Sequence, residues 1–171
     1  MGKYSDFERK DRDLYITPEP AVVPLLPHLK PGSSFVEPCA GDGALVRHLE
    51  KNGHRCHYAC DIVPLDARVH KRDMFDVNVC AAEYIITNPP WDRRVLHPAI
   101  DHFRNLAPTW LLFDSNWANT KQARPYLDYC AKIVAIGRVK WFPDSKMSGK
   151  EDCSWFLFQK EPADTIFIGR Q

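Results

Sequence analysis

The chain has 171 residues, which is the usual size of one domain. Hydrophobic residues make up 44% of it and charged residues 26%, ordinary globular proportions that exclude fibrous and disordered classes. The 23 Lys and Arg residues nearly balance the 22 Asp and Glu residues, so a nucleic acid would have to be held by a local basic patch.

Residues 1–14 are rich in charge and lack the apolar stretch of a secretory signal. We expect them to form a flexible arm, and residues 15–171 to form one folded domain. No apolar run approaches the ~20 residues that cross a membrane, so no membrane association is expected. The six cysteines form no Cys-x-x-Cys pair, which together with the missing signal indicates reduced thiols and a cytoplasmic location.

The predicted elements alternate between helices and short strands. The first helix has Thr17 as N-cap and Pro18 as its first residue, and it extends to about Leu29 with interruptions at Pro24 and Pro27. Short apolar runs predict seven strands, at Ser34–Glu37, Arg55–Cys60, Val69–Arg72, Tyr84–Thr87, Trp110–Phe113, Ile133–Gly137 and Ser154–Phe158. Helical spacing predicts further helices at Ala44–Lys51, Val95–Leu106 and Ala118–Ala131, the last divided at Pro125.

The order of these elements predicts the fold class. Strands that alternate with helices form a mostly parallel, doubly wound α/β sheet of the Rossmann-like kind. The continuous apolar run Trp110–Phe113 fits a strand that is buried on both faces of such a sheet. The last two strands have no clear helix between them, so we expect an antiparallel hairpin at one edge of a seven-stranded sheet.

Three groups of residues follow the first three strands, at the edge where ligands bind in open α/β sheets. The turn Glu37–Gly43 follows the first strand, and its glycines allow a ligand to approach the backbone closely. Asp61 follows the second strand, about 20 residues further on, where a carboxylate can hold ribose hydroxyls. Asp73 follows the third strand. The sequence therefore predicts a nucleoside site, unless the turn merely joins a strand to a helix.

The turn differs from a dinucleotide site. A Gly-x-Gly-x-x-Gly turn would place a pyrophosphate on a helix N-terminus, but Val46 stands where the third glycine belongs. Glu37 and Asp42 would repel a pyrophosphate and attract a cationic centre, such as a sulfonium or an amine. These residues favour S-adenosylmethionine (SAM) over a dinucleotide.

The tetrapeptide Asn88-Pro89-Pro90-Trp91 follows the fourth predicted strand. It resembles the Asn-Pro-Pro-aromatic motif of amino-group methyltransferases. With the turn Glu37–Gly43 upstream, the chain is similar to class I SAM-dependent methyltransferases of the N6-adenine type, such as the small enzymes of phages and prophages. The resemblance implies a single class I methyltransferase domain that binds SAM and DNA in the cytoplasm of a bacterial or phage-infected cell.

The chemistry of an adenine amine explains the residue types in this tetrapeptide. The nitrogen lone pair is delocalised into the ring, so the amine is a poor nucleophile. Two acceptors, the side-chain oxygen of Asn88 and the carbonyl of Pro89, would draw its N–H groups out of the ring plane. The prolines stiffen the loop, and Trp91 offers a face on which a flipped base can stack. The expected catalytic residues are therefore Asn88, Pro89, Pro90 and Trp91.

The resemblance also implies which residues hold the cofactor. The segment Tyr15–Pro18 resembles the upstream motif of the family, which lies against the methionine part of SAM. By the same resemblance, Asp61 binds the ribose hydroxyls, and Asp73 with Met74 or Phe75 holds the adenine. The expected cofactor residues are Tyr15, Thr17, Pro18, Glu37, Pro38, Cys39, Ala40, Gly41, Asp42, Gly43, Asp61, Ile62, Asp73, Met74 and Asn88.

The loop Arg138–Asp152 interleaves basic residues with Trp141 and Phe142, and it resembles a segment of the same small methyltransferases. Basic groups on phosphates and aromatic rings on bases would hold a single or splayed strand. A solvated β-hairpin with Trp141 in the core is an equally good interpretation. The expected substrate-binding residues are Trp91, Arg94, Arg138, Lys140, Trp141, Lys146 and Lys150.

No metal site is expected from the sequence. The run His54–Cys60 contains several His and Cys residues, but no second Cys/His pair stands at zinc spacing. A strand that leads to Asp61 is the better interpretation of this run.

Three functions remain open at this point. The leading hypothesis is methyl transfer from SAM to N6 of adenine in DNA. The same motif type serves adenine in RNA, N4 of cytosine and the glutamine amide of proteins, although Asn88 and Trp91 fit the last two less well. The third is a SAM-binding module or decoy without turnover. Because the elements of the fold take up nearly all of the chain, we expect specificity to come from short insertions, a specificity partner or a homodimer.

Overall fold

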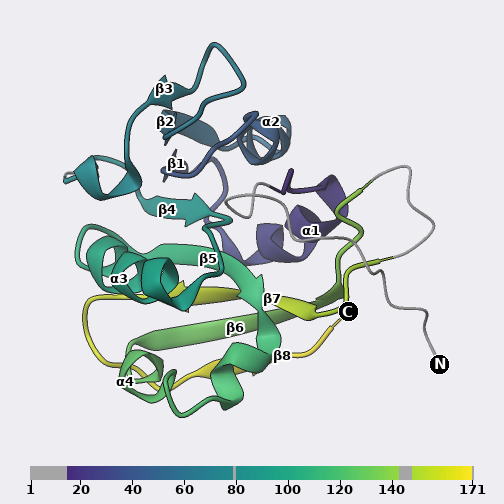
Figure 1. Cartoon of the computed structure of the whole chain (residues 1–171), viewed down its shortest axis with the longest axis vertical. Helices are drawn as coiled ribbons and strands as arrows, with labels where there is room; N and C mark the ends of the chain where they lie inside the picture. Colours follow the sequence, from purple (N-terminus) through teal and green to yellow (C-terminus); the bar gives the residue numbers. More distant parts are fainter. Residues whose placement is uncertain (1–14, 79, 143–147, 171) are drawn as a thin grey trace.

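The computed structural model describes residues 15–78, 80–142 and 148–170, so the expected arm at residues 1–14 lies outside them. Its strands form one eight-stranded sheet (Figure 1). The strands are β1 (Ser34–Glu37), β2 (Arg55–Asp61), β3 (His70–Lys71), β4 (Tyr84–Thr87), β5 (Thr109–Asp114), β6 (Cys130–Arg138), β7 (Asp152–Phe158) and β8 (Ile166–Ile168). The α-helices are α1 (Glu19–Val22), α2 (Ala44–Lys51), α3 (Arg93–Arg104) and α4 (Arg124–Leu127). The 3-10 helices are η2 (Val23–His28), η3 (Met74–Asp76) and η4 (Ser115–Asn119).

The strands lie in the order β3-β2-β1-β4-β5-β7-β6-β8, from top to bottom of Figure 1. The first five strands of this order are parallel, β7 is antiparallel to both of its neighbours, and β8 is parallel to β6. The chain leaves β1 on one side toward β2 and β3, and it then crosses to β4 on the other side. Ligands bind at such a switch point in doubly wound sheets. The prediction of a mostly parallel α/β sheet is confirmed.

Two details of the predicted sheet are wrong. The sheet has eight strands rather than seven. The additional strand, β8, pairs with β6, so the antiparallel hairpin β6–β7 lies inside the sheet and not at its edge. Because β8 has only three residues, of which Ile166 and Phe167 are exposed, its sequence lacks the pattern of a buried strand.

Two predicted helices also differ from the structure. The helix expected at Ala118–Ala131 is reduced to the four residues of α4, which begins near Pro125 because proline fits the first turn of a helix and not its interior. The chain has already entered β6 at Cys130. The N-cap of α1 is Pro18 rather than Thr17, and the side chain of Thr17 bonds elsewhere, as described below.

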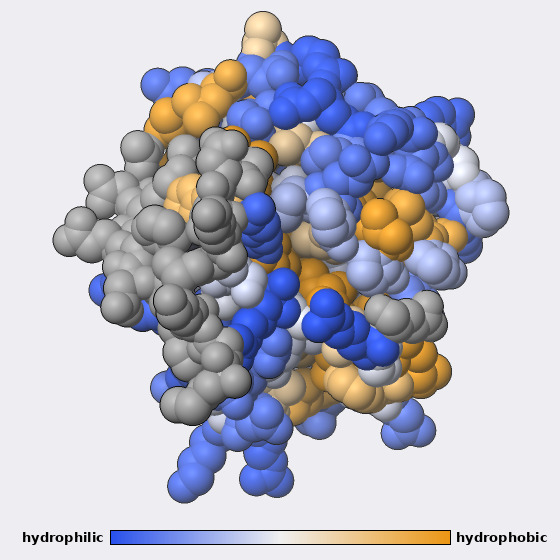
Figure 2. All heavy atoms as spheres, turned by 90° about the vertical axis from the view of Figure 1, so that its right-hand side faces the viewer, coloured by the Kyte–Doolittle hydropathy of each residue, from blue (hydrophilic) through white to orange (hydrophobic). Residues whose placement is uncertain are grey.

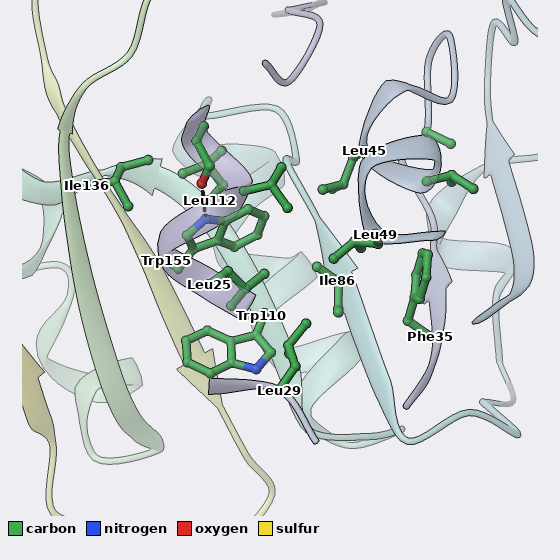
Figure 3. Packing of buried hydrophobic residues seen from close by; sticks show 14 of the residues in the cluster. Leu25, Leu29, Phe35, Leu45, Leu49, Ile86, Trp110, Leu112, Ile136 and Trp155 are labelled. Atoms are coloured by element: carbon green, nitrogen blue, oxygen red, sulfur yellow. Dashed lines mark hydrogen bonds between the residues drawn. The ribbon is translucent and has the colours of Figure 1, made fainter. Parts of the chain in front are cut away.

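Hydrophobic residues fill two layers, one on each face of the sheet. On β5, Trp110 and Leu112 face the layer under α1, η2 and α2, whereas Leu111 between them faces the layer under α3. Figure 3 shows the first layer, in which the indole N–H of Trp155 donates to the carbonyl of Ala21 over 2.7 Å. This bond ties α1 to β7. The parallel pairing of β1 with β2 and with β4 places the carboxyl ends of these strands beside one another.

Hydrophilic side chains cover most of the described part of the face shown in Figure 2, and hydrophobic residues reach it in separate groups. Most of the large hydrophobic side chains that are exposed in the described residues line the cavity discussed next. Within the part of the chain that the structure describes, every helix is too short or too polar to cross a membrane.

Candidate functional site

A cavity of about 630 Å³ opens at the switch point of the sheet. Its walls come from the turn after β1, the loops after β2 and β3, the loop after β4, and the segment before α1. Its volume falls within the ~300–1,000 Å³ that is typical of small-molecule sites.

Most of the residues expected from the sequence line this cavity. They are Tyr15, Thr17, Glu37, Pro38, Cys39, Ala40, Gly41, Asp42, Asp61, Ile62, Asp73, Met74, Asn88 and Pro90. Of the residues expected to bind the cofactor or to act in catalysis, four lie outside the lining that the described residues form, namely Pro18, Gly43, Pro89 and Trp91.

Sequence reasoning missed several residues of the lining. They are Ile16, Ala44, Leu45, Val63, Leu65, Asp92 and Val95. Phe75, which the resemblance implies only as an alternative to Met74, also lines the cavity. The available signal was proximity in sequence, because each stands within a few positions of an expected residue.

The turn after β1 is held against the end of β2. The N–H of Ala40 donates to the carbonyl of Cys60 over 2.9 Å, and the N–H of Gly41 donates to Oδ2 of Asp61 over 2.9 Å. Gly41 and Gly43 have φ angles of +51° and +75°, in the left-handed region that favours glycine. The two glycines therefore allow a tight turn whose backbone lies beside the cavity.

Asp61 connects this turn to the loop after β2. Its Oδ2 accepts the N–H of Gly41 and its Oδ1 accepts the N–H of Val63, both over 2.9 Å. These bonds fix the carboxylate on the cavity wall. Because each carboxylate oxygen can accept more than one hydrogen bond, Asp61 can order both loops and still receive a hydroxyl group.

The charge of Asp42 is paired, although the residue lines the cavity. Its Oδ2 lies 3.1 Å from Nη2 of Arg47, and its Oδ1 accepts the N–H of Ala44 over 3.0 Å. Arg47 also contacts Asp66, at 3.2 Å. Of the two carboxyls expected to attract a cation, Asp42 is therefore already partly neutralised, and Glu37 is left for that role.

The charged form of the Glu37 carboxyl is disfavoured by its surroundings in this site. The residue is only 2% exposed, and its Oε2 has no hydrogen-bond partner among the described residues. Burial, and after it the nearby carboxyls of Asp42 and Asp61, raise the pKa of Glu37 well above its usual value. A cation bound in the cavity would offset both effects, because it would pair with a carboxylate that burial and its acidic neighbours destabilise.

Asn88, the first residue after β4, lines the cavity and has its amide held at both ends. Its Nδ2 donates to the hydroxyl of Thr17 over 3.3 Å. Its Oδ1 accepts the indole N–H of Trp91 over 3.2 Å, and the same N–H lies 3.2 Å from the carbonyl oxygen of Leu112 in β5. Trp91 is half-buried and packs against both hydrophobic layers.

The loops after β2 and β3 form an apolar end of the cavity. Ile62, Val63, Leu65 and Phe75 are exposed large hydrophobic residues in its lining. The N–H of Phe75 donates to Oδ1 of Asp73 over 2.9 Å, which starts the 3-10 helix η3. Apolar side chains with a few fixed polar groups suit a flat heterocycle.

Trp91 and Trp141, the two aromatic residues expected to bind substrate, form a cluster with Tyr15 and Phe142 beside the cavity. The ring of Trp141 packs against those of Tyr15 and Trp91, with ring centroids 5.7 Å apart in both pairs. Phe142 meets Tyr15 at 6.0 Å. Of the four, only Tyr15 belongs to the lining formed by the described residues, so Trp141 fits the core interpretation better than that of an exposed stacking platform.

The basic residues expected to bind substrate lie on the surface. Arg94 is exposed and pairs with Asp92, the N-cap of α3, at 2.6 Å. Arg138 lies 4.0 Å from Asp152. The others are Lys140 and Lys150, which are exposed, and Lys146, which lies outside the described residues.

The His and Cys residues of the run His54–Cys60 do not form a metal site in the described part of the chain. Buried His54 shares a hydrogen bond of 2.9 Å with the hydroxyl of Ser33. All six cysteines are free thiols, as the sequence predicts. The described part of the chain contains no group of three or more His, Cys, Asp or Glu side chains arranged to hold a metal ion.

No model of a known protein family matches this chain, and no curated protein matches its sequence. Solved structures do match. A putative class I SAM-dependent methyltransferase from Listeria monocytogenes has a TM-score of 0.60 and 11% identity, over 96% of this chain and 68% of that one. A putative RNA methyltransferase from Pyrococcus horikoshii has a TM-score of 0.60 and 14% identity, over 94% and 93%.

A type I restriction-modification methyltransferase subunit from Streptococcus thermophilus also matches. It has a TM-score of 0.57 and 11% identity, over 91% of this chain but only 47% of that one. This chain likewise spans 44% of a further protein from a type I system. Such low identities show the fold alone. The sheet, with its switch point between β1 and β4 and its antiparallel β7, has the Rossmann-like fold of class I methyltransferases.

Proposed function

We propose that this chain binds SAM and transfers its methyl group to an exocyclic amine, the N6 amine of adenine in DNA. The observation that carries the proposal is that Asn88 lines the same cavity as Glu37, whose buried Oε2 has no hydrogen-bond partner among the described residues. The carboxylate of Glu37 can pair with a cation, whereas the side-chain oxygen of Asn88 can accept a hydrogen bond from an amine N–H. A site that transfers a methyl group from a sulfonium to an amine can use both groups, one to hold the cation and one to hold the amine.

The residues of the cavity fit SAM. Glu37 would lie near the positively charged methionine part, and Asp61 would receive the ribose hydroxyls. The apolar end, with Ile62 and Phe75, would hold the adenine. When bound, SAM supplies a methyl group on positively charged sulfur, which makes that carbon open to attack by a nucleophile.

Asn88 would prepare the amine. Its Oδ1, together with the carbonyl of Pro89, would accept the amine N–H groups and so turn the nitrogen lone pair out of the ring plane. Holding the nitrogen in this geometry removes part of the barrier before the reaction begins. An amide cannot take up the proton, so the proton lost by the amine would pass to water.

Adenine in DNA is proposed as the methyl acceptor because of the tetrapeptide Asn88-Pro89-Pro90-Trp91, and adenine in RNA is the second candidate. The neighbour from Pyrococcus horikoshii, almost all of which this chain covers, is described as a putative RNA methyltransferase. The neighbours from type I restriction-modification systems are consistent with DNA. Cytosine N4, a glutamine amide, and SAM binding without turnover are further outcomes of the same test.

We also place this activity in the cytoplasm and assign sequence specificity to a partner chain or a second copy of this one. The type I proteins are about twice as long as this chain, since it spans only 44% and 47% of them.

The test is to incubate the purified chain with methyl-labelled SAM and either unmethylated DNA or RNA, and then to identify the labelled nucleoside. We expect label in N6-methyladenine from DNA. Asn88→Ala should bind SAM within about 2-fold of the wild type by calorimetry and lose transfer by roughly 100-fold or more. Asn105→Ala, at the end of α3, is the matched control and should remain active. Label in another product would reassign the acceptor, and SAM binding without any label would contradict the proposal.

A further inference from the structure

Trp91 does not have the orientation that its place in the tetrapeptide suggests. A stacking residue would present its ring to the cavity, yet the lining formed by the described residues includes Asn88 and Pro90 but not Trp91. The ring is half-buried between hydrophobic layers, and its polar edge lies 3.2 Å from Oδ1 of Asn88. Its contact with the site is therefore made through Asn88.

Trp91 is anchored by groups other than Asn88. Its N–H also lies 3.2 Å from the carbonyl oxygen of Leu112, a fully buried residue in the middle of β5. Its ring meets that of Trp141 edge to face, with centroids 5.7 Å apart and planes at 74°. A ring held from two sides cannot follow a rotation of the Asn88 side chain.

An asparagine amide has two ends of similar shape and opposite hydrogen-bonding character. In the observed orientation, Oδ1 of Asn88 faces the donor of Trp91 and Nδ2 faces the hydroxyl of Thr17. A half-turn of the amide would place its NH₂ group against the N–H of Trp91, donor against donor. The fixed indole therefore selects the orientation, and Thr17 completes the clamp with a hydroxyl that can accept.

We propose that Trp91 is a positioning residue, which fixes Asn88 so that its oxygen and not its NH₂ group is offered to the substrate amine. This inference rests on the proposed function and deepens it. The amide oxygen has two acceptor sites, so it can accept from Trp91 and from the amine at the same time. The indole N–H, rather than a stacking face, is then what the reaction needs at this position.

The first test replaces Trp91 by phenylalanine, which keeps an aromatic ring and removes the N–H. Trp91→Phe should bind S-adenosylhomocysteine within about 2-fold of the wild type, and its kcat on unmethylated DNA should fall at least ~10-fold with little change in KM. Trp117→Phe is the matched control, because it removes an indole N–H that donates to His97 over 3.0 Å on α3, and its kcat should stay within about 2-fold. An unchanged kcat in Trp91→Phe would overturn the proposal.

A second test introduces Trp91→Phe into the Asn88→Asp protein, and it separates an effect of Trp91 on the orientation of the residue 88 side chain from an effect on packing. Asn88→Asp presents an oxygen at both ends, so it has no wrong orientation for Trp91 to prevent. In that background Trp91→Phe should cost at most ~2-fold, against at least ~10-fold in the wild type. Equal losses in the two backgrounds would show that Trp91 acts through packing alone.

A spectroscopic measurement is independent of turnover. The indole N–H resonance of Trp91, assigned by its loss in Trp91→Phe, should shift and exchange faster with solvent in Asn88→Ala. An unshifted resonance would overturn the clamp whatever the substrate is. If the wild type transfers no methyl group to DNA while the resonance shifts as expected, the proposed function fails and the clamp stands.

Discussion

The positions of some site residues follow from the local sequence, whereas the positions of others depend on contacts between distant elements. Asn88 and Asp61 follow predicted strands, so their place at the carboxyl edge of the sheet is a consequence of local pattern. The inward turn of Trp91 depends on the carbonyl of Leu112, which is 21 residues away in sequence and on another strand. The pairing of Asp42 depends on Arg47 one turn into α2. The contact of Trp91 with Leu112 joins two different elements, so no local pattern contains it, and the side-chain pairing of Asp42 depends on the geometry of the folded turn.

Glu37 provides a prediction at the same scale. The usual pKa of this carboxyl is 4.5, and in the folded chain it is raised. Below about pH 4.5 the carboxyl is therefore protonated in both the folded and the unfolded chain, and its burial costs little free energy. As the pH rises from there toward the raised pKa, the unfolded chain ionises first, so the folded state loses stability. Glu37→Gln should therefore be more stable than the wild type at pH 8, by about 1–3 kcal/mol, and the difference should shrink toward pH 4.5. Urea denaturation at several pH values measures it.

The same variant should bind the cofactor less well. If Glu37 pairs with the positive part of SAM, Glu37→Gln should weaken SAM binding at least ~10-fold in calorimetry. Glu50→Gln is the control, because Glu50 lies on the exposed side of α2 and pairs with Arg68, so it should alter stability by no more than ~0.5 kcal/mol and leave affinity unchanged. A Glu37→Gln variant that is less stable at pH 8, or that binds SAM as tightly as the wild type, would contradict this role.

At the scale of elements, the turn between β1 and α2 depends on backbone conformation. Gly43 has a φ of +75°, and a Cβ added to it would lie 3.3 Å from Nη1 of Arg47. Gly53, at the other end of α2, has a φ of +86° with no described atom within 4 Å of such a Cβ. Alanine should therefore cost about 1–2 kcal/mol at either position, because the left-handed conformation disfavours any Cβ. Only Gly43→Ala should also weaken SAM binding, because only Gly43 belongs to the turn beside the cavity.

Thermal unfolding and calorimetry of Gly43→Ala and Gly53→Ala check this prediction as a pair. Similar losses of stability with a loss of affinity in Gly43→Ala alone would support it. Equal affinities in the two variants would show that the cavity tolerates a shift of the turn.

Helices and strands could be predicted where the spacing of apolar residues within a short segment determines their bounds. The strands β1 and β4 and the helix α2 have the bounds that apolar spacing predicts. The two strands are short apolar runs with buried residues on both faces of the sheet, and α2 packs one apolar face on it. The segment after β5 did not follow its helical spacing. Its buried Trp117 and the early start of β6 at Cys130 leave room only for η4 and the short helix α4. Tertiary packing overrode the local pattern there.

For the whole molecule, alternation along the chain predicts a doubly wound sheet, but it does not fix the order of the strands. That order decides which residues meet at the cavity, and it also decides where the basic loop lies. Since β5 and β6 are both antiparallel to β7, they point in the same direction. Lys140 after β6 and Lys150 before β7 therefore lie at the edge where the cavity opens, whereas Lys160 after β7 lies at the opposite edge.

This distribution gives the last prediction. A net charge of +1 provides no general attraction to DNA, so binding must depend on the few cations near the cavity. The double variant Lys140→Gln/Lys150→Gln should weaken binding of a single-stranded oligonucleotide and reduce the slope of log K against log salt by up to about 1.4, that is ~0.7 for each phosphate contact. Lys160→Gln should change neither quantity. Fluorescence anisotropy between ~50 and ~200 mM salt measures both. An unchanged slope in the double variant would mean that this edge does not contact phosphates, and an equal loss in Lys160→Gln would mean that the attraction is diffuse.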